Sequence, residues 1–333
     1  MVEEIFKETI KKHQLLKKKD RLILGVSGGS DSVCMLYLFL RIKKEYRLNL
    51  ICTHFNHQLR READEEEEFV SKLCEKEKIK FISERKEVKK FFCGDSLEQT
   101  ARNLRYDFFL KVARQTKIKK LALAHHKDDL AETVLMRFIK GAGLRGLRGF
   151  LPKTKFKNLV IIRPLIQIRK KDILNWLEKS KIAYCIDKTN LEEKFLRNYL
   201  RLKISPLLEK INPNIVDNLS NLAKNLSYDY DFIYKFSHHQ FQLAEKGKSL
   251  NEVRLDLEKL KKLHPAILNN VIRIAIEETK GNLKRLENRH LEEIEDLILN
   301  RPPQSIVHLP FLLAKKEKED LVIQTLILNN DKV

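Results

Sequence analysis

The chain has 333 residues, of which 43% are hydrophobic and 34% are charged, a balance typical of a soluble globular protein with about two domains. Lys and Arg number 66 against 46 Asp and Glu, which gives a formal charge of +20. Such an excess favours a polyanionic partner, with nucleic acid as the first candidate. A lysine-rich surface with no such partner would give the same charge, so composition leaves both open.

The cysteines and the apolar runs indicate in which cellular compartment the protein is expected. The five cysteines are widely spaced and form no C-x-x-C pair, so a zinc ribbon or a paired-thiol redox site is not expected. An odd number of cysteines without a secretory signal is typical of the reducing cytoplasm, where we expect this protein. No apolar run approaches the ~18–20 residues that span a bilayer, so no membrane partner is expected. The cysteines are Cys34, Cys52, Cys74, Cys93 and Cys185.

The first 200 residues alternate short apolar runs with charged, amphipathic stretches. Strands alternating with helices predict an α/β fold with a doubly wound, parallel, five-stranded sheet. An amphipathic helix is expected first, at residues 3–18. The predicted strands are 22–26, 48–52, 80–83, 121–124 and 159–165, and further helices are expected from Ser32, Arg61, Ser96, Lys127 and Asp172 and around Arg197.

The loop after the first predicted strand has the features of a phosphate site. Ser27 to Ser30 carry no bulky side chain, so their backbone N–H groups can surround an oxyanion at the start of the next helix. The Gly-Lys-Ser/Thr ending of a Walker A loop is absent. Asp31 would repel a nucleotide unless a cation lay between them, which predicts Mg²⁺. An ordinary strand-to-helix turn is the alternative for Ser-Gly-Gly alone.

Polar residues also follow the second and fourth predicted strands, at the edge where open α/β sheets bind ligands. His54 follows the second strand, and the segment 125–133 follows the fourth. If a helix begins near Lys127, then Asp129 and Glu132 share one face. Two carboxylates at that spacing can share a metal ion or position an amine. A zinc site is a weaker alternative, because the His-Glu-x-x-His spacing and a nearby cysteine are absent.

The strongest basic tract runs from Arg137 to Lys171 and holds eleven Lys or Arg with no Asp or Glu. Four of the ten glycines lie between residues 141 and 149, which predicts a flexible or tightly turned loop. A tract this long without an acid predicts contact with a polyanion, and chance is the alternative. The candidate nucleic-acid contacts are Arg137, Lys140, Arg145, Arg148, Lys153 and Lys155.

The pattern changes after the turn Asn212-Pro213-Asn214. Residues 215–300 read as helices, and short strands are expected at 306–309 and 321–323. We therefore expect a catalytic domain at 1–212 and a second, mainly helical domain at 213–333 that ends in short strands.

Seven motifs together carry a family resemblance: Ser27-Gly-Gly-Ser-Asp-Ser32, His54-Phe-Asn-His-Gln-Leu-Arg60, Glu98-Gln-Thr-Ala-Arg-Asn-Leu-Arg-Tyr106, Ala124-His-His-Lys-Asp-Asp-Leu-Ala-Glu-Thr133, Gly141-Ala-Gly-Leu-Arg-Gly-Leu147, Arg163-Pro-Leu165, and Arg197-Asn-Tyr-Leu-Arg201 with Asn212-Pro213. The chain resembles the PP-loop (N-type) ATP pyrophosphatases, and within them the tRNA(Ile)-lysidine synthetases. The first motif alone would indicate only an ATP-using PP-loop enzyme, and the fourth and fifth in this order are far more specific. The resemblance covers about residues 20–215 strongly and the remainder weakly.

This resemblance implies an adenine nucleotide alpha-hydrolase-like fold and a two-step ligase reaction. ATP adenylylates the C2 oxygen of the wobble cytidine in a CAU-anticodon tRNA(Ile), and pyrophosphate leaves. Free L-lysine then attacks C2 through its ε-amino group and AMP leaves, which changes codon reading from AUG to AUA. The implied cofactors are ATP and Mg²⁺, the implied partners are that tRNA and lysine, and a homodimer is left open.

The resemblance also assigns roles to residues. Catalysis is implied for Asp31, Arg105, Asp129, Glu132, Arg197 and Arg201, and nucleotide binding for Ser27, Gly28, Gly29, Ser30, Asp31, Ser32, His54 and His125, with Mg²⁺ on Asp31. Asp129 and Glu132 would bind the lysine ammonium or accept its proton. His125 or His126 is a second candidate base, or only lines the adenylate pocket. The basic tract and the second domain would hold tRNA largely through phosphates, so binding should weaken steeply with salt.

Two departures from the family pattern and three alternatives remain. Thr189 stands where the family usually has Ser, and the chain ends near where longer members begin a further β-rich domain, which leaves open how the acceptor stem is checked.

A PP-loop tRNA thiolase would need paired cysteines or an iron–sulfur ligand set, which the spacings do not offer. Ammonia-using PP-loop enzymes are disfavoured by the basic tract. A non-catalytic tRNA-binding homologue is opposed by the intact Asp31, Asp129 and Glu132.

Overall fold

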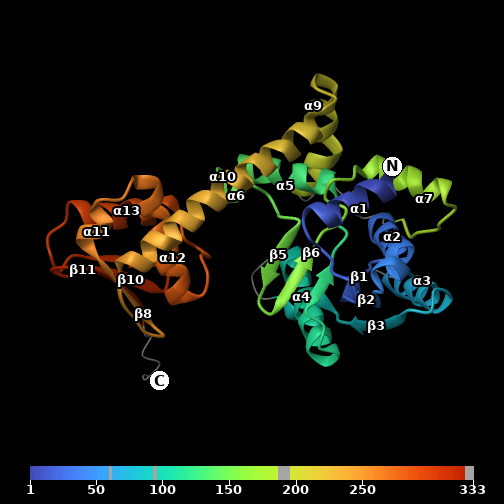
Figure 1. Ribbon diagram of the computed structural model, residues 1–333, viewed down its shortest axis with the longest axis horizontal. Coiled ribbons are helices and arrows are strands. Elements are labelled where there is room, and N and C mark those ends of the chain that lie inside the picture. The colour runs from blue at the N-terminus through green and yellow to red at the C-terminus, as the bar shows by residue number, and fades with distance from the viewer. Residues whose placement is uncertain (60–61, 93–95, 187–195, 327–333) are drawn as a thin grey trace. The chain divides into compact units, whose positions relative to one another are not determined.

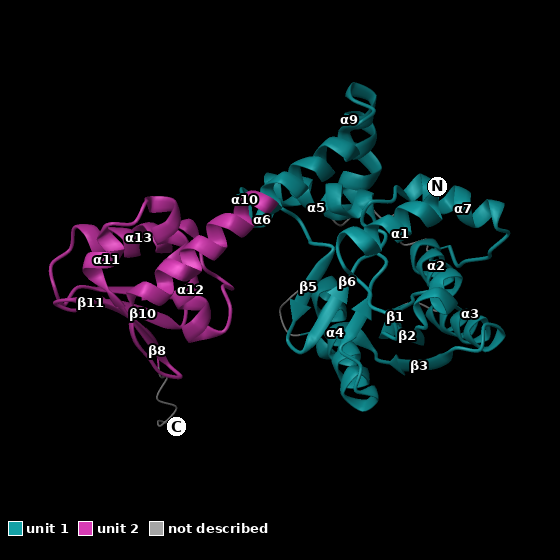
Figure 2. Ribbon diagram, viewed as in Figure 1, with its two compact units in different colours: residues 1–227 teal, residues 228–333 magenta. Residues whose placement is uncertain are grey.

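The protein forms two compact units, residues 1–227 and 228–333 (Figure 2). The computed structural model describes residues 1–59, 62–92, 96–186 and 196–326 (Figure 1). The predicted turn at 187–190, with Thr189, and Cys93 lie outside the described residues. The division between the units falls inside helix α10 (Ile215–Ala244), whereas the domain boundary expected from the sequence lies just after helix α9 (Ser205–Ile211). Among the described helices, none is long and apolar enough to cross a membrane.

Unit 1 is built on a six-stranded sheet in the order β3-β2-β1-β4-β6-β5. All five predicted strands are present and parallel, and the sheet gains one antiparallel edge strand, β5, that the sequence did not predict. Its residues, Lys-Thr-Lys-Phe, contain no apolar run, and none of them is buried. The strands are β1 Arg21–Gly25, β2 Asn49–Asn56, β3 Lys80–Arg85, β4 Lys120–Ala122, β5 Lys153–Phe156 and β6 Leu159–Ile162.

Helices cover both faces of this sheet, as predicted for a doubly wound fold (Figure 1). Alternate strand residues supply the two cores: Leu22 and Leu24 pack with α1, α2, α3 and α7 on one face, and Ile23 packs with α4 on the other. All three side chains are fully buried. The helices are α1 Val2–Lys12, α2 Ser30–Tyr46, α3 Glu62–Lys76, α4 Leu97–Thr116 and α7 Lys170–Lys179, with a short 3₁₀ turn at Val88–Phe91.

The remaining helices of unit 1 gather around helix α5 (Lys127–Ile139), which begins where the sequence predicted. Leu130 and Val134 of α5 form a small core with Ile166 and with Ala223 of α10. The short helix α6 (Leu144–Leu147) follows α5. Helix α8 (Leu196–Tyr199), a π-helical turn (Leu200–Ile204) and α9 follow one another directly along the chain.

One acidic residue of the Asp64–Glu68 run differs from the solvated face that its sequence suggests. Glu67 is buried and accepts hydrogen bonds from Asn56 Nδ2 at 3.0 Å, Ser83 Oγ at 2.7 Å and Arg85 Nε at 2.7 Å. Because these three donors come from β2 and β3, Glu67 ties α3 to that edge of the sheet. A charge run alone cannot show which member points inward.

Unit 2 contains the expected helices together with a larger sheet than the sequence predicted. Its five-stranded antiparallel sheet has the order β7-β8-β11-β10-β9 and is covered by three helices. The strands expected at 306–309 and 321–323 are present, whereas three others were missed, although Val253 and Leu255 alternate with charged residues as strands do. The elements are β7 Glu245–Lys248, β8 Glu252–Asp256, α11 Leu257–Lys261, α12 Pro265–Lys280, α13 Asn288–Leu299, β9 Ile306–Leu309, β10 Leu312–Lys316 and β11 Asp320–Thr325.

The connections of unit 1 reverse direction at strand β1. From β1 the chain adds β2 and then β3 on one side, and it later adds β4 on the other side. The carboxyl ends of β1 and β4 therefore flank the topological switch point, where open α/β sheets bind ligands. The phosphate loop and the segment 125–133 both begin at this point.

Candidate active site

The loop between β1 and α2 is held by hydrogen bonds from its own serines. Ser32 Oγ accepts from the N–H of Ser27 at 3.1 Å and donates to the carbonyl of Gly29 at 2.9 Å. Gly28 has φ +95°, and a Cβ there would lie 3.4 Å from Cys185 Sγ, so a side chain would be strained and crowded. Gly29 caps α2 without a side chain, which leaves the first N–H groups of α2 available to an anion.

His54 lies beneath this loop. Its ring Nδ1 is 3.0 Å from the carbonyl oxygen of Val26, and the side chain is buried. Burial lowers the pKa of His54, which favours the neutral ring that donates to this carbonyl. The structure thus places His54 against the backbone that supports the loop, and contact with a nucleotide stays a prediction.

Four of the predicted catalytic residues form one ion-pair cluster, which we call the Arg–carboxylate cluster: Asp129, Glu132, Arg197 and Arg201. Arg201 Nε lies 2.6 Å from Glu132 Oε1, and Arg197 Nε lies 3.0 Å from Glu132 Oε2. The NH2 groups of both arginines donate to Asp129 Oδ1, at 3.1 Å from Arg197 and 3.3 Å from Arg201. Segments about 65 residues apart in sequence therefore meet at the end of β4.

The backbone of both partners fixes this cluster. Asp129 and Glu132 are one turn apart on α5, while Arg197 lies on α8 and Arg201 on the π-helical turn that follows. π-Helical turns are rare and frequent at functional sites, because they change the direction of side chains along a helix. Here the turn gives both arginines access to the same pair of carboxylates.

The positive charges around Asp129 favour its ionised form. Burial raises the pKa of Asp129, but His126 and Arg197 outweigh it, so the pKa is lowered overall. Asp129 is therefore ionised at neutral pH and neutralised by two guanidinium groups. A lysine ammonium would have to compete for these carboxylates with Arg197 and Arg201, which are ion-paired to them in this structure.

Arg105 supplies a third guanidinium, for which no ion pair with a carboxylate is found among the described residues. Its Nε is buried and has no hydrogen-bond partner among the residues that the structure describes. Burial lowers the pKa of Arg105, and the nearby Arg102 and Arg197 lower it further. A half-buried guanidinium with a buried, unpaired Nε–H is suited to an anion such as a phosphoryl group.

The two adjacent histidines have opposite environments. Burial and the cations Arg163, Arg105 and Arg197 lower the pKa of His125 to about 3, against an opposing effect of Asp129, so this ring stays neutral. Burial also lowers the pKa of His126, but neighbouring carboxylates outweigh it and the net shift is upward. The ring atoms of His126 lie 3.4 Å from Asp129, 3.5 Å from Asp128 and 3.8 Å from Asp31. Of the two, His126 is the ring that can hold a proton near neutral pH.

Sequence reasoning missed Lys170 as a residue of the site. Its Nζ donates to Ser30 Oγ at 2.7 Å and to Asp31 Oδ1 at 2.6 Å. The side chain reaches the phosphate loop from the first turn of α7, about 140 residues further along the chain. Its only signal in the sequence is membership of the basic tract, where it was grouped with residues that face a polyanion.

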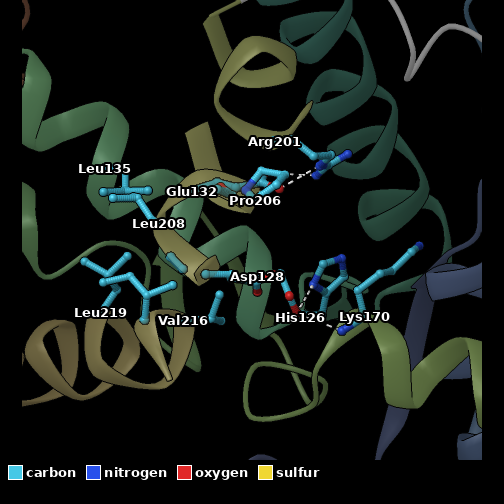
Figure 3. A pocket seen from close by; sticks show the side chains of 14 residues that line it. His126, Asp128, Glu132, Leu135, Lys170, Arg201, Pro206, Leu208, Val216 and Leu219 are labelled. Atoms are coloured by element: carbon cyan, nitrogen blue, oxygen red, sulfur yellow. Dashed lines mark hydrogen bonds and ion pairs between the residues drawn. The ribbon is translucent and has the colours of Figure 1, made fainter. Parts of the chain in front are cut away.

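A cavity of about 220 Å³ adjoins the Arg–carboxylate cluster. Figure 3 shows charged side chains, among them His126, Asp128, Lys170 and Arg201, on one side of the cavity and aliphatic side chains of α5, α9 and α10 on the other. The charged side faces the predicted reaction centre. The aliphatic side, with Leu135, Leu208 and Leu219, offers no partner for an amino-acid head group.

The predicted nucleic-acid contacts divide into two groups. Arg137 donates to the carbonyls of Gly146 at 2.6 Å and Gly149 at 2.7 Å, so its guanidinium braces the glycine loop. Arg148 Nε donates to the carbonyl of Arg145 at 3.2 Å, and both side chains are half-buried. Lys140 at the end of α5 and Lys153 and Lys155 on the edge strand β5 are exposed. The exposed lysines are thus the better placed contacts for phosphates.

The donor set at the phosphate loop fits Mg²⁺ only together with a nucleotide. Asp31 provides one carboxylate, and its side chain is 30% exposed. Mg²⁺ in such sites commonly takes one or two carboxylates and completes its shell with substrate phosphates and water. In the part of the chain that the structure describes, no group of three or more His, Cys, Asp or Glu is arranged to hold a metal. Asp31 with phosphate oxygens is therefore the fitting site.

Comparison with known families decides which family this is. The family profile described as the PP-loop domain matches residues 2–208, and the one described as the TilS substrate binding domain matches residues 255–315. The tRNA(Ile)-lysidine synthase of Clostridioides difficile is 35% identical over 322 residues, which cover 95% of this chain. The chain belongs to the tRNA(Ile)-lysidine synthase family. This membership confirms the resemblance seen in the motifs and favours it over a thiolase or a non-catalytic homologue.

Further relatives agree. The tRNA(Ile)-lysidine synthase of Caldanaerobacter subterraneus is 36% identical over 97% of this chain, and that of Clostridium tetani is 36% identical over 88%. The chain spans 69% of the Clostridioides and Caldanaerobacter relatives and 63% of the Clostridium tetani one. A solved U34-tRNA thiolase from Methanococcus maripaludis matches with TM-score 0.56 and 22% identity, over 68% of this chain and 78% of that chain. At this identity the likeness shows a shared PP-loop fold alone.

Proposed function

We propose that this chain ligates lysine to C2 of the wobble cytidine in a CAU-anticodon tRNA(Ile), with ATP converted to AMP and pyrophosphate. The observation that carries the proposal is the meeting of the phosphate loop with the Arg–carboxylate cluster at the switch point of the sheet, in a chain of this family. A phosphate site beside fixed arginines suits transfer of an adenylyl group.

In the first step, the C2 oxygen of the cytidine attacks the α-phosphorus of ATP and pyrophosphate leaves. The loop from Ser27 to Ser32 and the open N-terminus of α2 would bind the phosphates. Arg105, Arg197 and Arg201 would stabilise the negative charge that develops on the transferring group, as fixed planar donors. The carboxylates of Asp129 and Glu132 would orient Arg197 and Arg201, so these carboxylates would act on the phosphoryl group only through the two arginines.

Mg²⁺ would be held by Asp31 and would neutralise negative charge on the phosphate oxygens. The fit rests on the partly exposed carboxylate of Asp31 beside the loop, which phosphate oxygens and water would complete.

In the second step, the ε-amino group of lysine forms the C–N bond at C2, and AMP leaves with the electron pair of the C2–O bond. The ammonium must lose one proton before it attacks and a second after the bond forms. His126 is our candidate acceptor for the first proton, because its ring lies among three carboxylates and its pKa is raised despite burial. The pKa of His125, at about 3, makes this ring a poor base.

The tRNA would lie across the exposed lysines of the basic tract, and unit 2 would add contacts, since the substrate-binding profile matches there. Exposed lysines bind phosphates without reading bases, so they would position the tRNA, and the anticodon would be read nearer the Arg–carboxylate cluster.

The decisive experiment measures incorporation of labelled lysine into a CAU-anticodon tRNA(Ile) transcript by the purified chain, with ATP and MgCl₂. We expect incorporation that depends on ATP, with AMP and pyrophosphate formed in equal amounts. The control is the same transcript with a CAU-to-GAU anticodon change, which should accept no lysine. Normal binding of the CAU transcript with no incorporation would show that the proposed reaction is wrong.

A further inference from the structure

Lys170 is anchored at its backbone by the same helix that carries the Arg–carboxylate cluster. Its N–H donates to Asp128 Oδ2 at 2.7 Å, and the other oxygen of Asp128 accepts from Arg169 Nε at 3.1 Å. Arg169 in turn donates to Glu209 Oε1 at 2.8 Å on α9. The start of α7 is therefore fixed to α5 and α9, and the Lys170 side chain extends from that fixed point to the phosphate loop.

At the other end of this side chain, the ammonium neutralises the loop carboxylate. Lys170 Nζ is 2.6 Å from Asp31 Oδ1, while the second oxygen of Asp31 lies 3.8 Å from His126 Nε2. The Lys170 side chain is 36% exposed, so its tip has room to move. An ammonium has three donors, and Ser30 and Asp31 take two of them.

The position of this ammonium coincides with the place where a cation is needed. Asp31 stands beside the loop that would bind phosphates, and without a positive charge it would repel them. Lys170 supplies that charge from the protein itself. Lysine suits the task better than arginine, because its compact charge sits on a flexible stem and can move between neighbouring oxygens.

We propose that Lys170 is a nucleotide-contacting residue that shares the neutralisation of Asp31 with the metal ion and directs its free donor to the phosphates. The proposal rests on the proposed function, because it takes the loop to be the ATP site. Without metal, the ammonium stays on Asp31 and lets the polyphosphate enter. With Mg²⁺ on Asp31, the ammonium is released to the phosphate oxygens and balances charge on the departing pyrophosphate.

The test compares ATP binding in EDTA with ATP binding in MgCl₂, by calorimetry on the full chain without tRNA or lysine. Lys170→Met should weaken ATP binding in both media and weaken it about tenfold more in EDTA, the factor expected from the lower end of a hydrogen bond to a charged group. Lys170→Arg should recover most of the loss. The matched control is Lys171→Met, the exposed neighbour on the same turn, which should bind as wild type in both media.

A double-variant cycle with Asp31→Asn isolates the shared role. In the Asp31→Asn background, Lys170→Met should no longer increase the difference between the two media, because no carboxylate is left to neutralise. When Asp31 is unchanged, equal losses of ATP binding in EDTA and in MgCl₂ on Lys170→Met, or no loss in either medium, would overturn the proposal. If thermal unfolding shows that Lys170→Met is not folded, Lys170→Gln takes its place with the same expectations.

Failure of this proposal is distinguishable from failure of the proposed function. The binding measurements contain no tRNA and no lysine, so their outcome does not depend on the reaction. If lysine is incorporated but Lys170→Met weakens ATP binding equally in EDTA and MgCl₂, only the role of Lys170 is overturned. If no lysine is incorporated but Lys170→Met weakens ATP binding more in EDTA, only the proposed reaction is overturned.

Discussion

At the scale of single residues, the site is organised by charges that neutralise one another before any substrate arrives. Two carboxylates of α5 hold two arginines, three carboxylates surround one histidine, and one lysine covers the carboxylate of the phosphate loop. Buried charges are tolerated when they are paired in this way. Removing one charged side chain should therefore disturb catalysis more than the size of that side chain would suggest.

Glu132→Gln tests the orienting role of the cluster. The neutral amide keeps the shape but cannot neutralise Arg197 and Arg201, so we expect lysine incorporation to fall by about 10²–10³, as for loss of an oriented donor group. Binding of the tRNA transcript should stay within about twofold, because Glu132 is buried. Glu75→Gln, exposed on α3, is the control and should be fully active. A large loss of tRNA binding in Glu132→Gln would instead make this residue part of the tRNA site.

His125 should make the protein sensitive to acid. The unfolded ring takes up a proton below about pH 6.5, whereas the folded ring, with a pKa of about 3, stays neutral. The unfolded state thus binds more protons between these values, and the free energy of unfolding falls as pH falls, by up to about 1.4 kcal/mol per pH unit from this group.

His125→Gln removes that proton uptake. We expect its free energy of unfolding, from urea titrations between pH 7 and pH 4.5, to fall less steeply with acid than that of wild type. The exposed His239 on α10 is the matched control, and His239→Gln should keep the wild-type slope. Identical slopes for wild type and His125→Gln would contradict the burial of a neutral ring.

The raised pKa of His126 acts in the opposite sense. Its contribution to the free energy of unfolding is present below about pH 6.5 and is lost as pH rises through its folded pKa.

At residue scale, the sequence located acids and arginines better than it located lysines. Asp129 and Glu132 share a face because helical spacing sets it, and Arg197 and Arg201 are four residues apart for the same reason. That these two pairs meet, and that Lys170 meets Asp31, depends on contacts between segments far apart in the chain. Local spacing carries no information about such contacts.

At the scale of elements, the glycine loop after α5 is fixed by close packing. Gly149 has φ +64°, and a Cβ there would lie 2.4 Å from Leu130 Cδ1. Arg137 of α5 then binds the carbonyls of Gly146 and Gly149. The loop is therefore tightly turned rather than flexible, one of the two descriptions that its sequence left open.

Gly149→Ala should destabilise the protein by about 1–3 kcal/mol, because it adds a left-handed backbone penalty to an overlap with Leu130. Urea unfolding followed by circular dichroism measures this change. Gly143→Ala is the control: φ is −76° there and no atom lies within 4 Å of an added Cβ, so its effect should stay within about 0.5 kcal/mol. Similar effects of the two variants would show that packing does not fix this loop.

The elements that the sequence predicted are those with a strong local pattern. Of the five parallel strands of unit 1, β1, β2, β4 and β6 consist largely of buried residues and appear as apolar runs. Strand β3 has exposed ends and a half-buried middle, and its local pattern is the weakest of the five. Strands β5, β7 and β10 are short, rich in lysine, and antiparallel, and no residue of β5 or β7 is buried. Such segments form strands because a neighbour pairs with them, which a local pattern does not reveal.

At the scale of the whole molecule, the net charge of +20 predicts strong and salt-sensitive binding to tRNA. The exposed lysines of edge strand β5 offer a direct test, because they lie in the acid-free tract and their side chains are exposed to solvent. Their loss should act on affinity for any tRNA of similar shape, since phosphates carry no sequence information.

Lys153→Ala with Lys155→Ala should weaken tRNA binding and reduce the slope of log K against log salt by about 1.4–1.8, which corresponds to two phosphate contacts. Filter binding at several salt concentrations measures both quantities. Lys76→Ala with Lys80→Ala removes the same charge near the opposite edge strand β3 and serves as control. Equal changes in the two double variants would mean that net charge, rather than position, governs binding.

The sequence by itself determined the alternating α/β order, the phosphate loop and the family, because these depend on local periodicity and on contiguous motifs. Only the tertiary structure decided that unit 2 contains a five-stranded sheet, that Glu67 is buried, and that Lys170 covers Asp31. The same holds for the two histidines, which are neighbours in sequence and differ in pKa because one faces arginines and the other carboxylates. Strand pairing, burial and electrostatic fields arise between distant segments, and the folded chain alone brings those segments together.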